Sequence, residues 1–300
     1  MAATERAGTP SGPASTWPIE RLQPDDADGL CHLSIEAGWN QVAADWRLML
    51  TLGRGFGVRG ANRQWIASAL ALPLGPAIAW LSMVLVTKLE RGQGLGTRLL
   101  SRCLAEVETS GAAAGLDATE LGRPIYLPLG FRDVYPLSRW HAGPGTRQAV
   151  APPDGIVVRA ATPDDLQSIR AFDAPRSGFA REPILAHLLT RAPALARIAE
   201  RTDGTLAGYA LGRDGYRAWH VGPVVAEDEA IGLALLGAAF AATDEPVIAD
   251  IPDRHENARR WLADQGAFAP RGYVRMLLGD SSLRIGDGGR VFALAGPELA

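Results

Sequence analysis

The sequence has almost no lysine and very little cysteine. Lys88 is the single lysine among 30 basic residues, so arginine carries nearly all of the positive charge. Two cysteines, Cys31 and Cys103, are too few for a disulfide framework or a zinc site, and the five histidines show no metal-ligand spacing. We therefore expect no metal centre and no disulfide scaffold.

The chain also lacks an excess of basic charge and a long apolar run. A net charge of −3 gives no field for nucleic acid or an anionic membrane surface, and no run of 18 apolar residues indicates a membrane span. The first residues, 1–16, lack the apolar core of a signal peptide. We expect them to form a disordered leader on a cytoplasmic protein that binds neither nucleic acid nor membrane.

What is present is enough apolar sequence for two domains. The chain has 300 residues, 47% of them hydrophobic, and a Gly- and Pro-rich segment at 141–155 falls near its middle. A short apolar strand runs into x-Pro-Asp-Asp on each side of this segment, ending at Asp26 and at Asp165. The pattern predicts two divergent copies of one domain, at 17–140 and 156–300, joined by a linker at 141–155.

Each copy alternates strand and helix patterns, which is typical of an α/β (α+β) mixed sheet flanked by helices. In the first copy we expect helices near 25–37, 41–52, 94–109 and 124–129, and strands near 18–22, 56–59, 65–72, 77–86, 115–118 and 133–140. In the second copy we expect helices near 164–172, 182–191, 228–242 and 255–265, and strands near 156–159, 196–201, 206–213, 218–225, 246–251 and 273–278. The apolar tail that begins at Arg290 predicts one more strand.

The most informative stretch is a cationic, glycine-rich turn between a strand and a helix. The apolar strand at 77–86 leads into Lys88–Arg98, and Leu95, Leu99 and Leu100 begin a helical pattern. Three glycines leave room at the start of the helix, where free N–H groups and the helix dipole favour an anion. The sequence therefore predicts a phosphate-binding loop, although an ordinary Gly-rich turn is the alternative.

The spacing of the loop distinguishes among phosphate-binding families. It has neither the Gly-Lys-Ser/Thr of a P-loop nor the spacing of a dinucleotide fingerprint, but Arg91–Gly96 reads Arg-x-x-Gly-x-Gly. In this motif the chain resembles the GNAT superfamily of acyl-CoA-dependent N-acetyltransferases. The resemblance implies a fold of two tandem GNAT-like domains, each with a mostly antiparallel mixed sheet, and acetyl-CoA as the cosubstrate. It assigns acetyl-CoA to the backbone of one strand and to the loop: Val84, Leu85, Val86, Arg91, Gly92, Gln93, Gly94, Leu95, Gly96 and Thr97.

A second matching motif lies near the end of the first copy. Tyr126 is followed by Gly130-Phe131, in a Tyr-x-x-x-Gly-Phe pattern that resembles the GNAT C-terminal motif. The resemblance implies that Tyr126 is the general acid that protonates the departing thiolate of coenzyme A. The alternative is a tyrosine that only packs against Leu129 and Phe131.

A general base is harder to assign. The strand before the loop offers only Ser82 as a polar side chain, where many members of the family have a glutamate. Glu36 and Asp117 are the candidates, and Asp117 is flanked by apolar residues, so burial is expected to raise its pKa. A carboxylate that caps local backbone N–H groups is the alternative for Asp117.

The acceptor site is expected to involve the segment where the family has its substrate-binding helices. Trp39 and Asn40 lie in this segment, and Ser82 lies on the central strand. An indole can line an apolar pocket and an amide can orient a polar group, although packing in the core is the commoner role of tryptophan.

The second copy lacks both motifs. Its helix after the corresponding strand begins with Glu227, Asp228 and Glu229, which suit the helix dipole but would repel a pyrophosphate. No tyrosine stands where the first copy has Tyr126. We therefore expect a degenerate GNAT-like domain that helps to shape the substrate pocket.

These expectations combine into one function and two alternatives. The sequence favours an acetyl-CoA-dependent N-acetyltransferase in which the amine of a small molecule attacks the thioester directly in a ternary complex, because no Cys or Ser has an adjacent base. A monomer or homodimer is expected. The alternatives are a non-catalytic acyl-CoA-binding sensor or interaction module and, less favoured, a nucleotide-phosphate binder.

Overall fold

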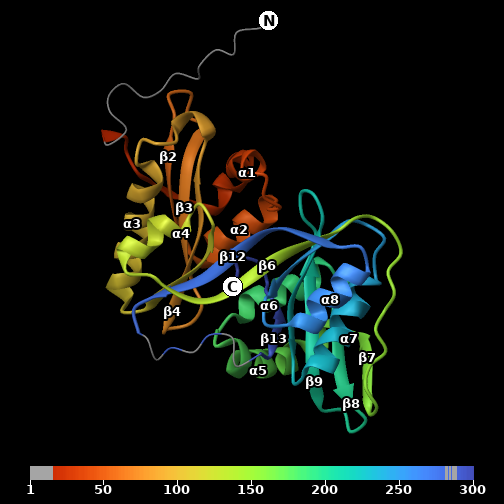
Figure 1. The fold of residues 1–300 in the computed structure, drawn as a ribbon. Helices are drawn as coiled ribbons and strands as arrows, with labels where there is room; N and C mark the ends of the chain where they lie inside the picture. The colour runs from red at the N-terminus through yellow and green to blue at the C-terminus, as the bar shows by residue number, and fades with distance from the viewer. Residues whose placement is uncertain (1–15, 281–282, 284, 286–288) are drawn as a thin grey trace, which may run out of the picture. The chain divides into compact units, whose positions relative to one another are not determined.

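The computed structural model describes residues 16–280, 283, 285 and 289–300. Most of the expected leader, residues 1–15, lies outside this described part. Contacts divide the chain into two compact units, residues 1–114 and 115–300, which are described in turn. Figure 1 gives the element labels used below.

The first unit is an antiparallel meander with helices on both faces. Its strands are paired in the order β1–β2–β3–β4, each antiparallel to the next. Helix α3 lies on one face, and α1 and α2 lie on the other (Figure 1). Fully buried Trp46 and Trp80 fill the core. The bounds are β1 (Glu20–Leu22), α1 (Ala27–Glu36), α2 (Ala43–Leu52), β2 (Arg54–Arg59), β3 (Trp65–Pro73), β4 (Ile78–Val86) and α3 (Leu95–Ser110), with 3-10 turns at Pro24–Asp26 and Lys88–Glu90.

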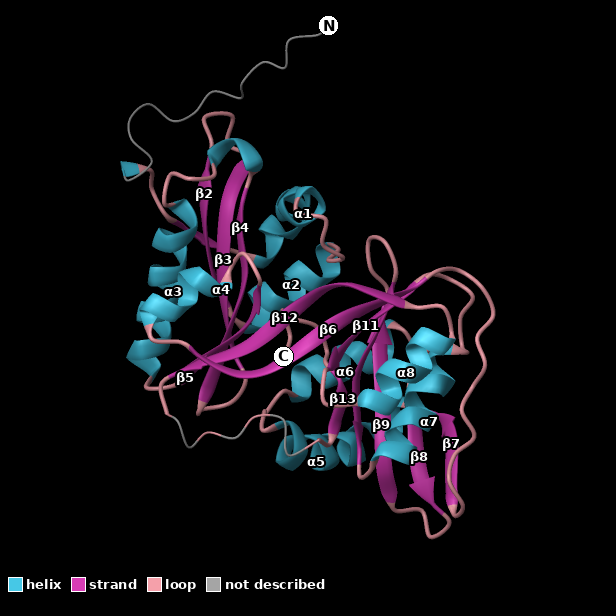
Figure 2. Ribbon diagram, in the orientation of Figure 1, coloured by secondary structure: helices cyan, strands magenta, loops and turns pink. Residues whose placement is uncertain are grey.

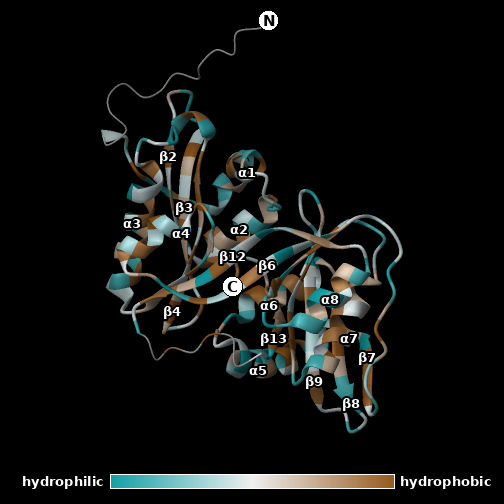
Figure 3. Cartoon of the chain, viewed as in Figure 1, coloured by the Kyte–Doolittle hydropathy of each residue, from teal (hydrophilic) through white to brown (hydrophobic). Residues whose placement is uncertain are grey.

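The second unit is a larger mixed sheet with the order β5–β12–β6–β11–β10–β9–β8–β7 (Figure 2). Strands β10 and β11 pair in parallel, which makes the sheet mixed. Helix α7 is apolar over most of its length and is buried (Figure 3). The bounds are β5 (Ala113–Thr119), α4 (Arg123–Tyr126), β6 (Arg132–Ala142), β7 (Ile156–Ala160), α5 (Leu166–Ser177), α6 (Glu182–Arg191), β8 (Arg197–Arg201), β9 (Leu206–Arg213), β10 (Trp219–Ala226), α7 (Glu229–Phe240), β11 (Val247–Pro252), α8 (Glu256–Asp264), β12 (Phe268–Leu278) and β13 (Val291–Ala293), with 3-10 turns at Leu127–Leu129 and Pro163–Asp165. The predicted mixed, mostly antiparallel sheets flanked by helices are confirmed, and so is the predicted strand in the tail.

The last strands of the two copies are exchanged. Strand β6 ends the first copy but lies between β11 and β12 of the second, and β12 lies between β5 and β6 (Figure 2). The antiparallel β6–β12 pair has Leu137 opposite Tyr273 near its centre. The last strand of each copy therefore pairs with strands of the other copy. This exchange explains why the compact units divide after Ala114 rather than within 141–155, the segment predicted to be a linker.

The segment 143–155 has no helix or strand, but it is held against the second unit. The Arg147 guanidinium is buried and donates to the carbonyl oxygens of Thr243, at 2.7 Å, and Glu245, at 2.9 Å. The amide of Gly145 donates to the carbonyl of Asp244 at 2.8 Å. The segment is therefore a packed connection instead of a freely extended linker.

Cleavage of this connection is expected to leave the two fragments associated. A protease site inserted at the exposed Ala151–Pro152 position would cut the chain between β6 and β7. The β6–β11 and β6–β12 pairings would remain across the cut. Size-exclusion chromatography of the cut protein should show one peak that contains both fragments. Two separate folded peaks would contradict the strand exchange.

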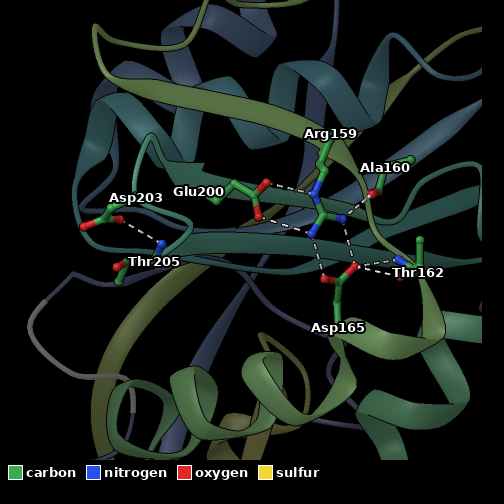
Figure 4. Close-up of polar contacts among 7 residues, drawn as sticks. All are labelled: Arg159, Ala160, Thr162, Asp165, Glu200, Asp203 and Thr205. Atoms are coloured by element: carbon green, nitrogen blue, oxygen red, sulfur yellow. Dashed lines mark hydrogen bonds and ion pairs between the residues drawn. The ribbon is translucent and has the colours of Figure 1, made fainter.

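A charged triad supports the internal duplication. Arg159 on β7 donates to Asp165, which caps the 3-10 turn through Thr162, and to Glu200 on β8 (Figure 4). In the first copy, Arg59 on β2 donates to Asp26 and Glu20 in the corresponding places. The arginine and the glutamate have exchanged strands between the copies, while the aspartate has stayed. In both copies an arginine therefore bridges the aspartate of the turn after the first strand and a glutamate on the neighbouring strand.

Candidate functional site

The glycine loop of the first unit is exposed and unobstructed. Gly92 and Gly94 have φ values of +79° and +77°, a conformation that a side chain would strain. A Cβ placed on either glycine would meet no atom within 4 Å. The backbone therefore turns tightly into α3 and leaves space in front of the loop, as the sequence predicts.

The start of α3 has the features of an anion site. Its N-cap residue is Gly94, no side chain caps it, and its first turn contains no acidic residue. The first N–H groups of a helix lack partners within the helix, and the helix dipole makes this end positive. Glu90, the nearest acid in the preceding turn, is buried and accepts a hydrogen bond from Gln93 Nε2 at 2.7 Å. The loop therefore presents backbone donors with little competing negative charge.

Arg91 adds a cation that is fixed by the strand before the loop. Its Nε donates to the carbonyl oxygen of Val86 at 3.1 Å, and the side chain is exposed. This bond orients the guanidinium at the end of β4, where its terminal nitrogens can reach an anion on the loop.

Strand β4 carries a bulge directly before the loop. Ser82 is opposite Leu70 and Leu85 is opposite Ser68, so Met83 and Val84 together face one residue of β3. Met83 has a φ of +52°, which is strained for a residue other than glycine. The Ser68 hydroxyl donates to the Met83 carbonyl at 2.8 Å. The bulge is therefore held in place and disturbs the regular ladder at the predicted cofactor strand.

The loop and the bulged strand are adjacent. A Cβ on Gly96 would lie 3.5 Å from Val86 Cγ2 and 3.9 Å from Val84 Cγ1. The structure therefore brings together the strand and loop residues predicted to bind the cofactor. Ser68, which supports the bulge, is missed by sequence reasoning because it is a small polar residue within an otherwise apolar strand.

Glu36, a candidate base, connects α1 to the turn before the loop. Its Oε1 accepts a hydrogen bond from the Lys88 amide at 2.8 Å. This bond uses one carboxylate oxygen and fixes the other near the end of β4. Glu36 therefore has a positioning role in the structure, and its role as a base stays a prediction.

The predicted substrate residues differ in exposure. Ser82 is 8% exposed, and its hydroxyl has no hydrogen-bond partner among the described residues. Asn40 is buried, whereas Trp39 is partly exposed just after α1. A buried hydroxyl without a hydrogen-bond partner is uncommon and can bind a polar group of a ligand. Ser82 is therefore the strongest of the three predicted substrate contacts.

Asp117, the other candidate base, is clamped by an arginine from β12. Arg275 Nε and Nη2 donate to its two oxygens, both at 2.8 Å, and both side chains are buried. Burial raises the pKa of the Asp117 carboxyl, and the guanidinium opposes this effect. Both oxygens are engaged, which favours a structural ion pair over proton transfer.

The second copy repeats this clamp. Arg139 on β6 donates to both oxygens of Asp250 on β11, each at 2.7 Å. In each case the carboxylate lies on the copy's own strand and the guanidinium comes from the exchanged strand of the other copy. Sequence reasoning missed Arg275 and Arg139, because more than 100 positions separate each arginine from its aspartate.

Tyr126 lies at the end of the short helix α4 in the second unit. Its ring packs on Phe131 with centroids 5.8 Å apart, and Arg123 pairs with Asp133 to hold α4 on the start of β6. Burial raises the pKa of the phenol, so the group keeps its proton at neutral pH. The side chain is thus a stable proton donor, and its catalytic role stays a prediction.

The helix that corresponds to α3 in the second copy begins with a side-chain cap. Asp228 accepts a hydrogen bond from the Ile231 amide at 2.9 Å and caps α7. Glu227 pairs with Arg201 and lies 3.7 Å from Arg176. The predicted acids therefore occupy the helix start, and one of them uses a backbone donor that a phosphate would need.

No group of three or more potential metal ligands is found among the described residues. No helix within the described ranges is both long and apolar enough to cross a membrane.

Two comparisons of sequence find acetyltransferases. Residues 169–293 match a family model described as an acetyltransferase (GNAT) domain. An uncharacterized N-acetyltransferase of Bacillus subtilis, YitH, is 25% identical over 250 residues, which cover 82% of this chain and 86% of that protein.

Solved structures show the same fold at low sequence identity. A putative acetyltransferase from Pyrococcus horikoshii superimposes with a TM-score of 0.74 and 18% identity over 94% of this chain and 95% of that one. A tandem GNAT protein from the clavulanic acid biosynthesis pathway gives a TM-score of 0.60 and 16% identity over 88% of this chain and 100% of that one.

The family model matches the second copy, the one that lacks the glycine and tyrosine motifs. The match shows that this copy keeps the sequence pattern of the family, and its predicted degeneracy stays a prediction. Residues 169–293 therefore resemble a GNAT acetyltransferase domain in sequence, and the chain has the fold of tandem GNAT proteins.

Proposed function

We propose that this protein is an acetyl-CoA-dependent N-acetyltransferase whose cosubstrate binds at the glycine loop of the first copy. The GNAT domain and the N-acetyltransferase relative support acyl transfer in general. The observation that carries the finer proposal is the open, uncapped start of α3, with Gly92 and Gly94 in front of it and Arg91 beside it.

The pyrophosphate of acetyl-CoA fits this loop by charge and by shape. Backbone N–H groups at the start of α3 can donate to the phosphate oxygens, and the helix dipole favours negative charge there. The resemblance to the family places the pantetheine arm along Val84–Val86. The bulge supports this, because it removes backbone groups of the strand from the regular ladder with β3.

The reaction we propose is direct transfer. The lone pair of a neutral amine attacks the thioester carbon, the new C–N bond forms, and the C–S bond breaks. Backbone N–H groups near the bulge can hold the carbonyl oxygen as negative charge develops. The coenzyme A thiolate takes a proton from Tyr126, and the amine proton passes to a base, for which Glu36 is the candidate. The acceptor is proposed to be the amine of a small molecule.

Calorimetric titration with acetyl-CoA tests the cosubstrate. The account expects saturable binding that does not need magnesium. ATP with magnesium is the matched control for a nucleotide-phosphate site and is expected not to compete. If wild-type protein shows no binding of acetyl-CoA, the assignment of the loop is wrong.

Tyr126→Phe is expected to lower kcat by about 100-fold or more, because a positioned general acid contributes about 100- to 10,000-fold. The KM for acetyl-CoA should change little, since the phenol is not part of the phosphate-binding loop. Leu129→Ala alters packing near the same turn and serves as a control. Steady-state thiol release measures both variants, and an unchanged kcat in Tyr126→Phe would assign the phenol to packing only.

A non-catalytic acyl-CoA sensor is the second candidate. The observation that favours it is β4 itself, in which Ser82 is the only polar side chain and no glutamate is present. Such a protein would bind acetyl-CoA but release no thiol with any amine, and Tyr126→Phe would have no effect.

A further inference from the structure

We propose that the C-terminal segment of the chain, residues 290–294, is the resident occupant of the acyl-CoA slot of the second copy. This inference rests on the proposed function, because it takes the bulged strand and loop of the first copy as the pattern for an acyl-CoA slot. It gives a structural reason why the second copy, which keeps the fold, is expected not to bind acyl-CoA.

Strand β10 has the same bulge as β4. Val221 is opposite Gly212 and Val224 is opposite Ala210, so Gly222 and Pro223 together face one residue of β9. In the first copy Met83 and Val84 hold these positions. Pro223 therefore corresponds to Val84, and proline has no N–H group to offer to an acyl oxygen or a pantetheine amide.

The two central strands of the second copy stop pairing just before the bulge. Strands β10 and β11 are parallel, pair at Trp219–Val247 and His220–Ile248, and end their pairing there. Past this point the edge of β10 faces an opening between the strands. This opening corresponds to the edge that would receive the pantetheine arm in the first copy.

Strand β13 fills this opening. Val224 and Val225 of β10 pair antiparallel with Ala293 and Val291, and the Ala226 amide donates to the Arg290 carbonyl at 3.0 Å. On the other side, the Leu294 amide donates to the carbonyl of Asp250 on β11 at 2.9 Å. The tail thus supplies backbone bonds to both separated strands.

The tail is packed as core and not as a loose cover. Val291, Phe292, Ala293 and Leu294 are each at most 3% exposed. The Phe292 ring lies so close to α7 that a Cβ on Gly232 would be 2.5 Å from it. The His255 ring packs against the same ring at a tilt of 35°, with centroids 4.3 Å apart, and its Nε2 lies 2.8 Å from the Val291 carbonyl oxygen.

Residues beyond the slot fix the segment further. Glu298 is buried against Arg213, and the Arg181 guanidinium donates to Ala300. A Cβ on Gly222 would be 1.8 Å from the Leu294 carbonyl oxygen, so the bulge itself is built to accept the tail. Displacement of the tail would break all of these contacts, whereas the loop of the first copy is open.

Hydrogen–deuterium exchange on the full chain, with and without saturating acetyl-CoA, tests the proposal. The amides of Leu294 and Ala226 are expected to be protected equally in both states. Peptides covering Gly92–Arg98 should gain protection with acetyl-CoA and act as the internal control. Rapid exchange at Leu294 without ligand, or faster exchange at Leu294 and Ala226 with acetyl-CoA, would overturn the proposal.

The number of acetyl-CoA molecules bound per chain is the second readout. We expect one in the wild type and none in Gly96→Glu, which adds a negative charge to the loop of the first copy. A second equivalent in the wild type, or one equivalent retained in Gly96→Glu, would show that the slot of the second copy is open. If the wild type binds none and the Gly92–Arg98 peptides do not respond, the proposed function fails, while exchange at Leu294 still decides whether the tail closes the slot.

Discussion

Arg275→Ala is expected to lower the free energy of unfolding by about 3–5 kcal/mol, because removal of one partner leaves a buried charge uncompensated. Arg275 and Asp117 have side chains at most 1% exposed and share two hydrogen bonds. Without the guanidinium, Asp117 would have to stay charged in an apolar site or take up a proton. Urea denaturation of the full chain measures the loss.

An exposed pair in the same unit provides the matched control. Arg170 and Glu182 are ion-paired at 2.7 Å with both side chains 49% exposed. Arg170→Ala should therefore cost less than about 1 kcal/mol. The double variant Arg275→Met with Asp117→Leu should recover most of the loss, since apolar packing can replace a buried ion pair. A loss in Arg275→Ala no larger than in Arg170→Ala would contradict the clamp.

Gly96→Glu is expected to weaken acetyl-CoA binding by roughly 100-fold or more. Two like charges about 4 Å apart cost about 1 kcal/mol in water and about 4 kcal/mol near a protein surface, and a pyrophosphate carries more than one charge. The fold should tolerate the change, because a Cβ there makes only ordinary contacts with Val86 and Val84. An acid at a helix N-terminus is itself mildly stabilising.

Gly96→Ala separates charge from bulk in this experiment. The methyl group adds volume at the same position without a charge, so affinity should stay within several-fold of the wild type. Thermal unfolding should give similar midpoints for both variants. Equal loss of affinity in Gly96→Ala and Gly96→Glu would point to steric exclusion, and equal retention would place the pyrophosphate elsewhere.

Local patterns in the sequence were enough to predict the elements. The apolar strand before the loop, the three glycines and the helical spacing after them define β4, the turn and α3 without any distant contact. The x-Pro-Asp-Asp repeat revealed the duplication because the same turn begins both copies. The apolar tail from Arg290 was correctly predicted as a strand for the same local reason.

The sequence could not reveal which strands pair across the chain. Nothing in the local sequence of β6 or β12 depends on whether the strand pairs within its own copy or is exchanged, so the exchange follows only from the structure. The clamps on Asp117 and Asp250 depend on that exchange. Asp117 is a candidate base in the sequence because it is a single acid in an apolar strand. An aspartate that forms a structural ion pair has the same sequence surroundings, so the sequence does not distinguish the two roles.

The sequence also could not reveal that the tail strand β13 pairs with β10. The run Val291–Ala293 is short and apolar, and such a segment can add to any open sheet edge. The edge is available because β10 and β11 stop pairing after His220, just before the bulge at Gly222 and Pro223. Neither residue indicates a bulge by itself, because the bulge is defined by the register between β10 and β9.

Thiol release from acetyl-CoA in the presence of a panel of small amines tests the central claim most directly. The panel should contain polyamines, amino acids and amino sugars, with acetyl-CoA alone as the blank. The account predicts that wild-type protein releases coenzyme A in an amine-dependent manner and that Gly96→Glu reduces this rate to the blank. Release that is independent of every amine, or an undiminished rate in Gly96→Glu, would contradict acyl transfer at the glycine loop.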